Sequence, residues 1–214
     1  ENGRQMMVSK NIISFNSRIW NLDELPERIS IEIVFGCNLK CGMCHVPNTK
    51  ERKFKLMDTW VFETIINQLD SKKTVHLNID GEPLLHPNIV QFIHYAKEKG
   101  HIVGFATNAT KLTEELSQKL IESKLDYITF SIDGGTPETY EKIRKGASFS
   151  AVVQNVKTFC ALNQKKGVDT RVDCILSDLT EPEIDKICDL WEGVTRVNFI
   201  PLDDWAGQIT LPDE

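Results

Sequence analysis

Apolar residues along this chain follow two alternating spacings. Short runs rich in β-branched and aromatic residues predict strands, and apolar residues three or four positions apart predict amphipathic helices. The two patterns alternate along most of the sequence. Strands are expected at residues 30–35, 75–79, 102–106, 127–132, 168–176 and 194–200.

Helices are predicted between these strands. Asp58 is expected to cap the first, with a buried stripe of Trp60, Val61, Ile65 and Leu69. Pro87 suits a first helical turn and Gly100 the end of the same helix. Helices are expected at residues 58–69, 87–100, 114–123, from 136 or 137, from 148 or 150 through 159, and at 181–191.

Strands that alternate with helices favour a parallel sheet with right-handed crossovers. A closed eight-fold barrel typically needs about 250 residues, whereas this chain has 214 and six repeats. A partial barrel and an open doubly wound sheet both satisfy the pattern. In either arrangement, the loops after the strands form the functional face.

Unusual residues are concentrated in these loops. The first strand is followed by three cysteines spaced C-x3-C-x2-C, namely Cys37, Cys41 and Cys44. The next three strands are followed by Asp-Gly-Glu-Pro at 80–83, Thr-Asn at 107–108 and Ser-Ile-Asp-Gly-Gly at 131–135. Four separate segments are therefore expected to meet on one face.

Composition excludes several classes of function. The 41% hydrophobic and 26% charged residues are ordinary for a globular protein. The net charge of -6 does not indicate binding to nucleic acid or to an anionic membrane. No apolar run reaches the roughly 18 residues of a membrane span. The first residues contain no apolar region typical of a secretory signal. Six cysteines then favour reduced thiols or metal ligands, and we expect a cytoplasmic location.

Several kinds of site fit the cysteines. A thioredoxin-like redox pair at Cys41 and Cys44 leaves Cys37 unexplained, and covalent haem on C-x-x-C-H, ending at His45, normally accompanies export. Structural zinc normally adds a second cysteine or histidine pair 12 to 20 residues on, which this chain lacks. An iron–sulfur cluster uses all three thiols and leaves one iron open. We therefore expect an iron–sulfur cluster.

The ordered motifs resemble the radical S-adenosylmethionine (SAM) superfamily. Residues 80–83 are similar to its GGEP element, with Asp80 in place of the first glycine, and residues 107–108 to its ATN element. Residues 131–134 and 139–146 resemble a subgroup that often carries a SPASM or twitch extension. The resemblance covers about residues 30–200.

The resemblance implies an α/β fold, a (βα)6 partial TIM barrel with a parallel sheet and outer helices. It divides the chain into an N-terminal lead-in at 1–28, a core domain at 29–200 and the start of a C-terminal extension or tail at 201–214.

The resemblance also implies a reaction. Cys37, Cys41 and Cys44 ligate three irons of a [4Fe–4S] cluster, and SAM chelates the fourth through its amino and carboxylate groups. An electron from a donor such as flavodoxin or ferredoxin cleaves SAM to methionine and a 5′-deoxyadenosyl radical, which abstracts hydrogen from the substrate. No further catalytic residue is assigned.

The loop after the second strand would then face the methionine part of SAM. Gly81 and Glu82 would line its amino group, largely through backbone, while Pro83 stiffens the turn. Met43 takes the position beside adenine, although a methionine that fills a gap in the loop fits equally well.

Further cofactor contacts are implied by the later loops. Ser131 would contact the ribose hydroxyls, with Thr107 and Asn108 as polar neighbours. Arg144 would pair with the cofactor carboxylate, or else be a solvated cation at a helix end. Asp133 would contact substrate or cofactor, or else form a turn.

The remaining thiols and imidazoles are assigned structural roles. Cys160, Cys174 and Cys188 have apolar neighbours in predicted helices and a strand, where free cysteine acts as a small buried hydrophobe. The other four histidines show no ligand spacing and are expected to be structural or on the surface: His76, His86, His94 and His101.

The predicted function is that of a radical SAM enzyme, an oxidoreductase or modifying enzyme, and we favour a peptide or protein substrate. A sugar or other small-molecule dehydrogenase or epimerase is the alternative within the superfamily. A non-catalytic cluster- or zinc-binding regulatory or scaffold protein is the alternative from another class. Neither nucleic acid nor a membrane is expected as a partner.

Overall fold

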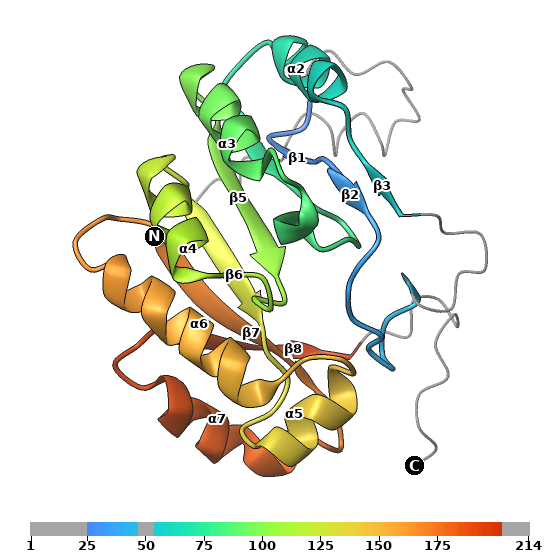
Figure 1. Cartoon of the computed structure of the whole chain (residues 1–214), viewed down its shortest axis with the longest axis vertical. Coiled ribbons are helices and arrows are strands. Elements are labelled where there is room, and N and C mark those ends of the chain that lie inside the picture. The colour runs from blue at the N-terminus through green and yellow to red at the C-terminus, as the bar shows by residue number, and fades with distance from the viewer. Residues whose placement is uncertain (1–24, 47–53, 203–214) are drawn as a thin grey trace, which may run out of the picture.

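A six-stranded, wholly parallel sheet forms the centre of the protein (Figure 1). The computed structural model describes residues 25–46 and 54–202. The strands of this sheet are β1 (Arg28–Ser30), β4 (Thr74–His76), β5 (Ile102–Thr107), β6 (Tyr127–Ser131), β7 (Asp169–Leu176) and β8 (Arg196–Pro201). They lie in the order β1-β4-β5-β6-β7-β8.

This strand order decides between the two predicted architectures. Each strand pairs with the next one along the chain, so the order never reverses as it does in a doubly wound sheet. The predicted (βα)6 partial barrel with a parallel sheet is therefore confirmed. β1 and β8 are the two edges of the sheet.

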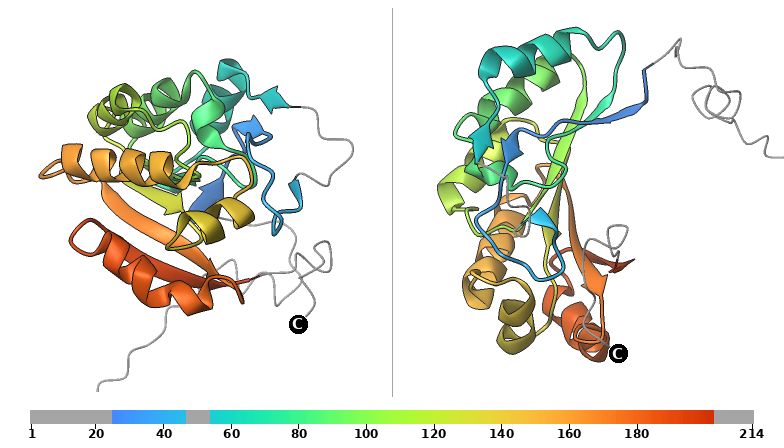
Figure 2. Two further views of the ribbon diagram at one scale, coloured as in Figure 1. Left: turned by 60° about the horizontal axis from the view of Figure 1, so that its bottom comes forward. Right: turned by 90° about the vertical axis from the view of Figure 1, so that its right-hand side faces the viewer.

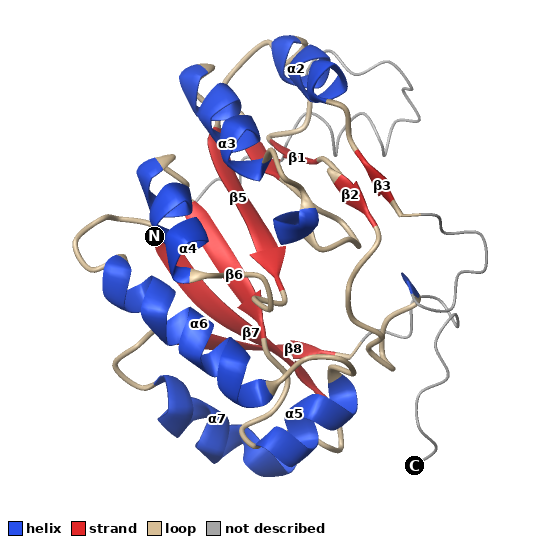
Figure 3. Ribbon diagram, viewed as in Figure 1, coloured by secondary structure: helices blue, strands red, loops and turns tan. Residues whose placement is uncertain are grey.

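The helices lie along one side of the sheet, its outer face (Figures 2 and 3). They are α2 (Thr59–Asn67), α3 (Ile89–Glu98), α4 (Glu114–Glu122), α5 (Pro137–Ile143), α6 (Phe149–Leu162) and α7 (Ile184–Trp191), with 3-10 turns η2 (Pro83–Leu85) and η3 (Glu181–Glu183). The core fills the space between these helices and the sheet. Phe105, Phe130 and Val172 contribute to it from three successive central strands.

Local signals set most helix ends where the sequence predicts them. The Thr113 side chain accepts a hydrogen bond from Leu116 N at the start of α4, and Thr136 caps α5 ahead of Pro137. Gly100 follows α3 with φ at 85°, the left-handed conformation that glycine tolerates. Asp58 stands at the N-cap position of α2 as predicted, but its side chain makes no capping hydrogen bond.

The first predicted strand is wrong in its extent. Instead of one strand over 30–35, β1 ends at Ser30, and Val34–Phe35 form β2 in a separate antiparallel pair with β3 (Lys55–Leu56). Ile33 between them is buried, so the apolar run reflects burial under neighbouring segments rather than a continuous ladder. The second predicted strand also ends early, at His76, which leaves Ile79 exposed.

The buried face of α2 also differs from the prediction. Trp60 is 68% exposed, whereas Phe62 and Ile66 are buried. Phe62 stacks on Phe92 of α3 with ring centroids 4.2 Å apart, and this contact fixes which side of α2 faces the core. The predicted domain limits stay predictions, since residues 1–24 and 203–214 lie outside the described ranges.

Candidate cofactor site

A cavity of about 230 Å³ lies at the carboxyl ends of the strands. Every site residue predicted from the sequence lines it, except Asp133. These residues are Cys37, Cys41, Met43, Cys44, Gly81, Glu82, Thr107, Asn108, Ser131 and Arg144. The fold thus brings together segments more than 100 residues apart in the sequence, because parallel strands deliver their following loops to one edge.

The cysteine loop is held at both sides by backbone hydrogen bonds. Gly36 O accepts from Glu82 N at 2.9 Å, before the first cysteine. Lys40 N donates to Lys145 O at 3.0 Å, which ties the middle of the loop to the segment after α5. These bonds fix the loop that carries Cys37, Cys41 and Cys44, although none of those residues is in a helix or strand.

Cys41 is buried, Cys37 and Cys44 are half-buried, and polar groups surround the thiols. The Cys37 sulfur accepts from Leu39 N at 3.4 Å and from Asn108 Nδ2 at 3.6 Å. Cys41 interacts with the Arg144 guanidinium. Burial raises the pKa of all three thiols, Cys44 included, while the N–H donors and the cation oppose that rise. Thiolates here are therefore unfavourable until a cationic partner is bound.

The turn that follows β4 fits only with glycine at position 81. A Cβ on Gly81 would lie 1.8 Å from Val34 O, so the two backbone segments could not approach as they do. Glu32 fixes the same turn, because its carboxylate accepts from Asp80 N at 2.7 Å and from Gly81 N at 3.1 Å. In the sequence Glu32 is simply the polar residue of an expected strand, so this role was missed.

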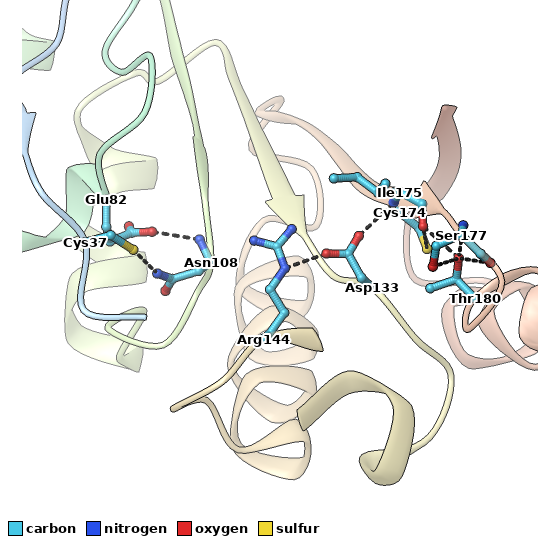
Figure 4. Close-up of polar contacts among 9 residues, drawn as sticks. All are labelled: Cys37, Glu82, Asn108, Asp133, Arg144, Cys174, Ile175, Ser177 and Thr180. Carbon is cyan, nitrogen blue, oxygen red and sulfur yellow. Dashed lines mark hydrogen bonds and ion pairs between the residues drawn. The ribbon is translucent and has the colours of Figure 1, made fainter. Parts of the chain in front are cut away.

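The Glu82 carboxylate is buried and joined to its neighbours by hydrogen bonds. Oε1 accepts from Thr107 Oγ1 at 2.6 Å and from Leu84 N at 3.0 Å. Oε2 accepts from Asn108 N at 2.8 Å, as Figure 4 shows. Burial raises the pKa of this carboxyl, and the three donors oppose the rise. Glu82 therefore joins the loop after β4 to the end of β5.

Asn108 is oriented by its own local contacts. Its Oδ1 accepts from Thr110 N at 3.0 Å and from Thr110 Oγ1 at 2.7 Å. The amide nitrogen is thereby directed to Cys37 (Figure 4). It also donates to Asn38 Oδ1 at 3.1 Å. The side chain of Asn108 thus donates toward the cysteine loop.

Arg144 is a buried cation held by Asp133. Its Nε lies 2.5 Å from Asp133 Oδ2, and the other oxygen of Asp133 accepts from Ile175 N at 2.7 Å (Figure 4). The Arg144 side chain is 13% exposed, unlike a solvated cation at a helix end. Burial opposes its charge, but Asp133 and Cys41 outweigh that effect and raise its pKa. Asp133 lies behind Arg144 instead of lining the cavity.

Two further side chains meet beside the thiols. Nε2 of His45 lies 3.3 Å from Oδ2 of Asp80, the residue at the first glycine position of the GGEP-like element. The sequence did not predict this contact, because it joins two loops whose residues lie 35 positions apart.

The leftover cysteines lie apart from the cavity. Cys174 is fully buried and Cys160 half-buried, as expected. Cys188 is exposed on α7, so its predicted burial is wrong: it lies on the solvent side of a helix that buries Ile187 and Trp191.

The donor set of the cavity fits an iron–sulfur cluster. Three thiols of one loop line a single cavity together with a buried cation and a side-chain amide donor. Within the described ranges, no three His, Cys, Asp or Glu side chains are arranged to hold a single metal ion. Thiols that each ligate a different iron of a cluster can lie farther apart than the ligands of one ion.

The fold and the site together define an α/β partial barrel with a thiol-lined cofactor cavity at the carboxyl ends of its strands. A family model described as "Radical SAM superfamily" matches residues 31–197. The chain therefore belongs to the radical SAM superfamily, whose members are enzymes that use a [4Fe–4S] cluster and SAM.

Two relatives illustrate the sequence similarity. The probable GTP 3′,8-cyclase of Methanococcus maripaludis is 30% identical over 178 residues, 81% of this chain and 59% of the relative. The mycofactocin maturase MftC of Mycobacterium ulcerans is 27% identical over 139 residues, 64% of this chain and 37% of the relative. The chain thus spans between about a third and three fifths of these relatives.

Solved structures agree with the fold. Streptococcus suis SuiB, bound to the precursor peptide SuiA, superposes with a TM-score of 0.73 at 16% identity, covering 100% of this chain and 49% of SuiB. The structure of native anSMEcpe with bound AdoMet gives a TM-score of 0.67 at 22% identity, covering 83% of this chain and 52% of anSMEcpe. Among the helices of the described ranges, none has the length and apolar character needed to cross a bilayer.

Proposed function

We propose that the chain is the core of a radical SAM enzyme in which Cys37, Cys41 and Cys44 ligate a [4Fe–4S] cluster. The observation that carries this proposal is the meeting of the three thiols and the buried Arg144 cation around one cavity. A cluster and SAM bound there would supply the electron and the sulfonium whose reductive cleavage yields methionine and a 5′-deoxyadenosyl radical for hydrogen abstraction.

The residues of this chain would bind and orient SAM. Arg144 would pair with its carboxylate through the guanidinium nitrogens that Asp133 leaves unused, since Asp133 contacts only Nε. The turn at Gly81 would present backbone to the amino group. Ser131 would contact the ribose hydroxyls and Met43 would pack on adenine; both line the cavity.

Thr107 and Asn108 would act nearer the cluster. The Asn108 amide donates to Cys37, and such donors to cluster sulfurs raise the reduction potential. Thr107 donates to Glu82, which holds Asn108 in place. Glu82 and Asp133 are thus positioning residues.

We propose a peptide or protein as the substrate. This choice is supported by the similarity to SuiB, which was solved with a precursor peptide, and to anSMEcpe, which was solved with peptides. A small-molecule substrate is the second candidate, favoured by the 30% identity to a GTP cyclase. A flavodoxin or ferredoxin is the proposed electron donor and the cytoplasm the proposed location, because the thiols must stay reduced to bind iron.

Production of 5′-deoxyadenosine tests this function. The chain is loaded anaerobically with iron and sulfide, reduced with dithionite and incubated with SAM, and 5′-deoxyadenosine is measured by mass spectrometry. The wild-type chain and Cys188→Ala, altered on the exposed side of α7, are expected to form it, and Cys41→Ala is not. A chain that binds one zinc and takes up no iron, or a cluster-loaded chain that leaves SAM intact, would contradict the proposal.

A further inference from the structure

The inner face of the sheet, opposite the helices, is polar and charged. Along β6, Ile128 and Phe130 belong to the core, so the alternate residues Tyr127, Thr129 and Ser131 face inward. β7 follows the same rule, with Val172 and Cys174 in the core and Arg171, Asp173 and Ile175 on the inner face. Closed barrels fill this position with branched apolar side chains. This inner face is therefore suited to a polar ligand.

A tyrosine and a histidine meet near the amino-terminal end of this face. Gly104 makes room for them, since a Cβ there would lie 2.5 Å from the Tyr127 ring. The ring lies over β5 and brings its hydroxyl within 3.0 Å of His76 Nδ1. Arg28 Nη2 lies 3.5 Å from the same nitrogen. Burial, with the positive charges of Arg28 and Arg171, lowers the pKa of His76 to about 4.

The arginines of this face are unequally neutralised. Arg171 pairs with Asp173, with Nε to Oδ1 at 2.6 Å, and Arg196 pairs with Asp169. Arg28 has no carboxylate partner within the described ranges, and its side chain contacts the neutral His76. An exposed guanidinium without a carboxylate partner thus lies at the β1 edge of this face, in a chain whose net charge is -6.

The charged face continues into the cofactor cavity. Ala106, Ser131 and Ile175 line the cavity and also belong to inner-face positions of β5, β6 and β7. Thr129 and Arg171 pair in register, two residues before Ser131 and roughly 7 Å from it along the strand. The arginines and the cavity therefore lie on the same face of the sheet.

We propose that the inner face binds the side-chain carboxylates of an acidic peptide, with Arg28 and Arg171 as the donors. This inference rests on the proposed function, in which a peptide is the substrate, and names its chemical class. The Arg28 guanidinium reaches His76, which lies in the row of Gly104 and Tyr127, four residues below Ser131. About four residues of extended peptide would span the distance to the Arg28 guanidinium and about two the distance to Arg171, so acidic residues at these two spacings from the reacting residue would meet the arginines.

Binding of two labelled peptides tests the inference. Fluorescein-labelled hexaglutamate and hexaglutamine are titrated into the cluster-loaded chain, and fluorescence anisotropy is measured. Hexaglutamate is expected to bind at least about 10-fold more tightly, with affinity that falls as salt rises. Arg28→Gln is expected to weaken the binding of hexaglutamate by about 5- to 10-fold. The double variant Arg171→Gln, Asp173→Asn is expected to weaken it by the same factor. Asp173 is replaced together with Arg171 so that no carboxylate is left unpaired.

The controls distinguish binding at these arginines from nonspecific attraction between hexaglutamate and any positive charge on the protein. Lys119→Gln removes a cation from the opposite, helical side, where Lys119 pairs with Glu115, and is expected to leave binding unchanged. Thermal unfolding of each variant confirms that it folds. Equal affinity for both peptides, undiminished binding by Arg28→Gln, or displacement of hexaglutamate by inorganic phosphate more readily than by glutarate would overturn the inference.

Failure here is distinguishable from failure of the proposed function. The binding experiment requires neither reductant nor SAM cleavage. Formation of 5′-deoxyadenosine without preference for hexaglutamate overturns the acidic-peptide site alone. Tight, arginine-dependent binding of hexaglutamate without 5′-deoxyadenosine supports the site and overturns the proposed function.

Discussion

The Glu82 carboxylate accepts the backbone N–H of Asn108 at 2.8 Å, although the two residues lie in loops after different strands. The same carboxylate also accepts from Thr107 and Leu84. Asn108 in turn directs its amide nitrogen to the Cys37 sulfur. Glu82 therefore controls the position of a donor to the cysteine loop without itself touching a thiol.

Truncation of Glu82 should lower stability. Glu82→Ala leaves three donors without their acceptor in a buried position, which is expected to reduce the free energy of unfolding by about 3 kcal/mol. Urea unfolding measures the change. Glu115→Ala, on the exposed surface of α4, is the control and should change it far less than Glu82→Ala does. Equal effects of the two substitutions would remove the structural role given to Glu82.

Two glycines in neighbouring site loops should respond differently to alanine. Gly81→Ala places a Cβ 1.8 Å from Val34 O, so we expect a loss of about 3 kcal/mol or more and a displaced loop. Gly42→Ala meets no atom within 4 Å and is expected to be nearly neutral. Thermal unfolding of both variants gives the comparison. A stable Gly81→Ala variant would show that the strand and loop are farther apart than described.

Removal of Arg144 should cost far more than removal of an exposed arginine. Arg144→Gln leaves Asp133, which is 1% exposed, without its cation, and a loss of about 3 to 5 kcal/mol is expected. Arg196→Gln breaks an ion pair whose side chains are both more than half exposed, and should cost less than about 1 kcal/mol. Chemical unfolding of the two variants at neutral pH measures the difference. Similar losses would contradict the buried pairing.

His76 should make stability depend on pH. Its pKa is lowered to about 4 in the fold from an ordinary value near 6.5, so the unfolded chain binds more protons between these values. Stability is therefore expected to fall as pH decreases from 6.5 toward 4, by less than about 1.4 kcal/mol per pH unit because His76 is only partly buried.

The pH effect is isolated by comparing variants. His76→Asn should flatten the dependence of unfolding free energy on pH across this window, while His94→Asn, altered at an exposed position of α3, should not. Parallel curves for wild type and His76→Asn would contradict the assignment.

The sequence predicts the alternation of strands and helices, and the loops that carry the site, better than it predicts the contacts between those loops. Alternating strands and helices, capped by residues such as Thr136 and Gly100, depend on local chemistry that can be read from neighbouring residues. The cysteine spacing likewise lies within one loop. Because parallel strands place their following loops at one edge, the site residues could be gathered before the structure was known.

Long-range contacts explain what the sequence did not predict. Glu32 looks like the outward residue of a strand, and only the approach of Gly81 to Val34 gives its carboxylate two backbone donors. The buried face of α2 depends on the stacking of Phe62 on Phe92, 30 residues away. The inner-face arginines required strand register, which periodicity alone does not supply.

The central claim is that three thiols hold a cluster whose remaining iron is open to SAM. Low-temperature electron paramagnetic resonance of the reduced, iron- and sulfide-loaded chain tests it most directly. A [4Fe–4S] signal is expected that changes when SAM is added, and that Cys41→Ala abolishes while Cys188→Ala keeps. A signal that is identical with and without SAM, or that survives in Cys41→Ala, would contradict the account.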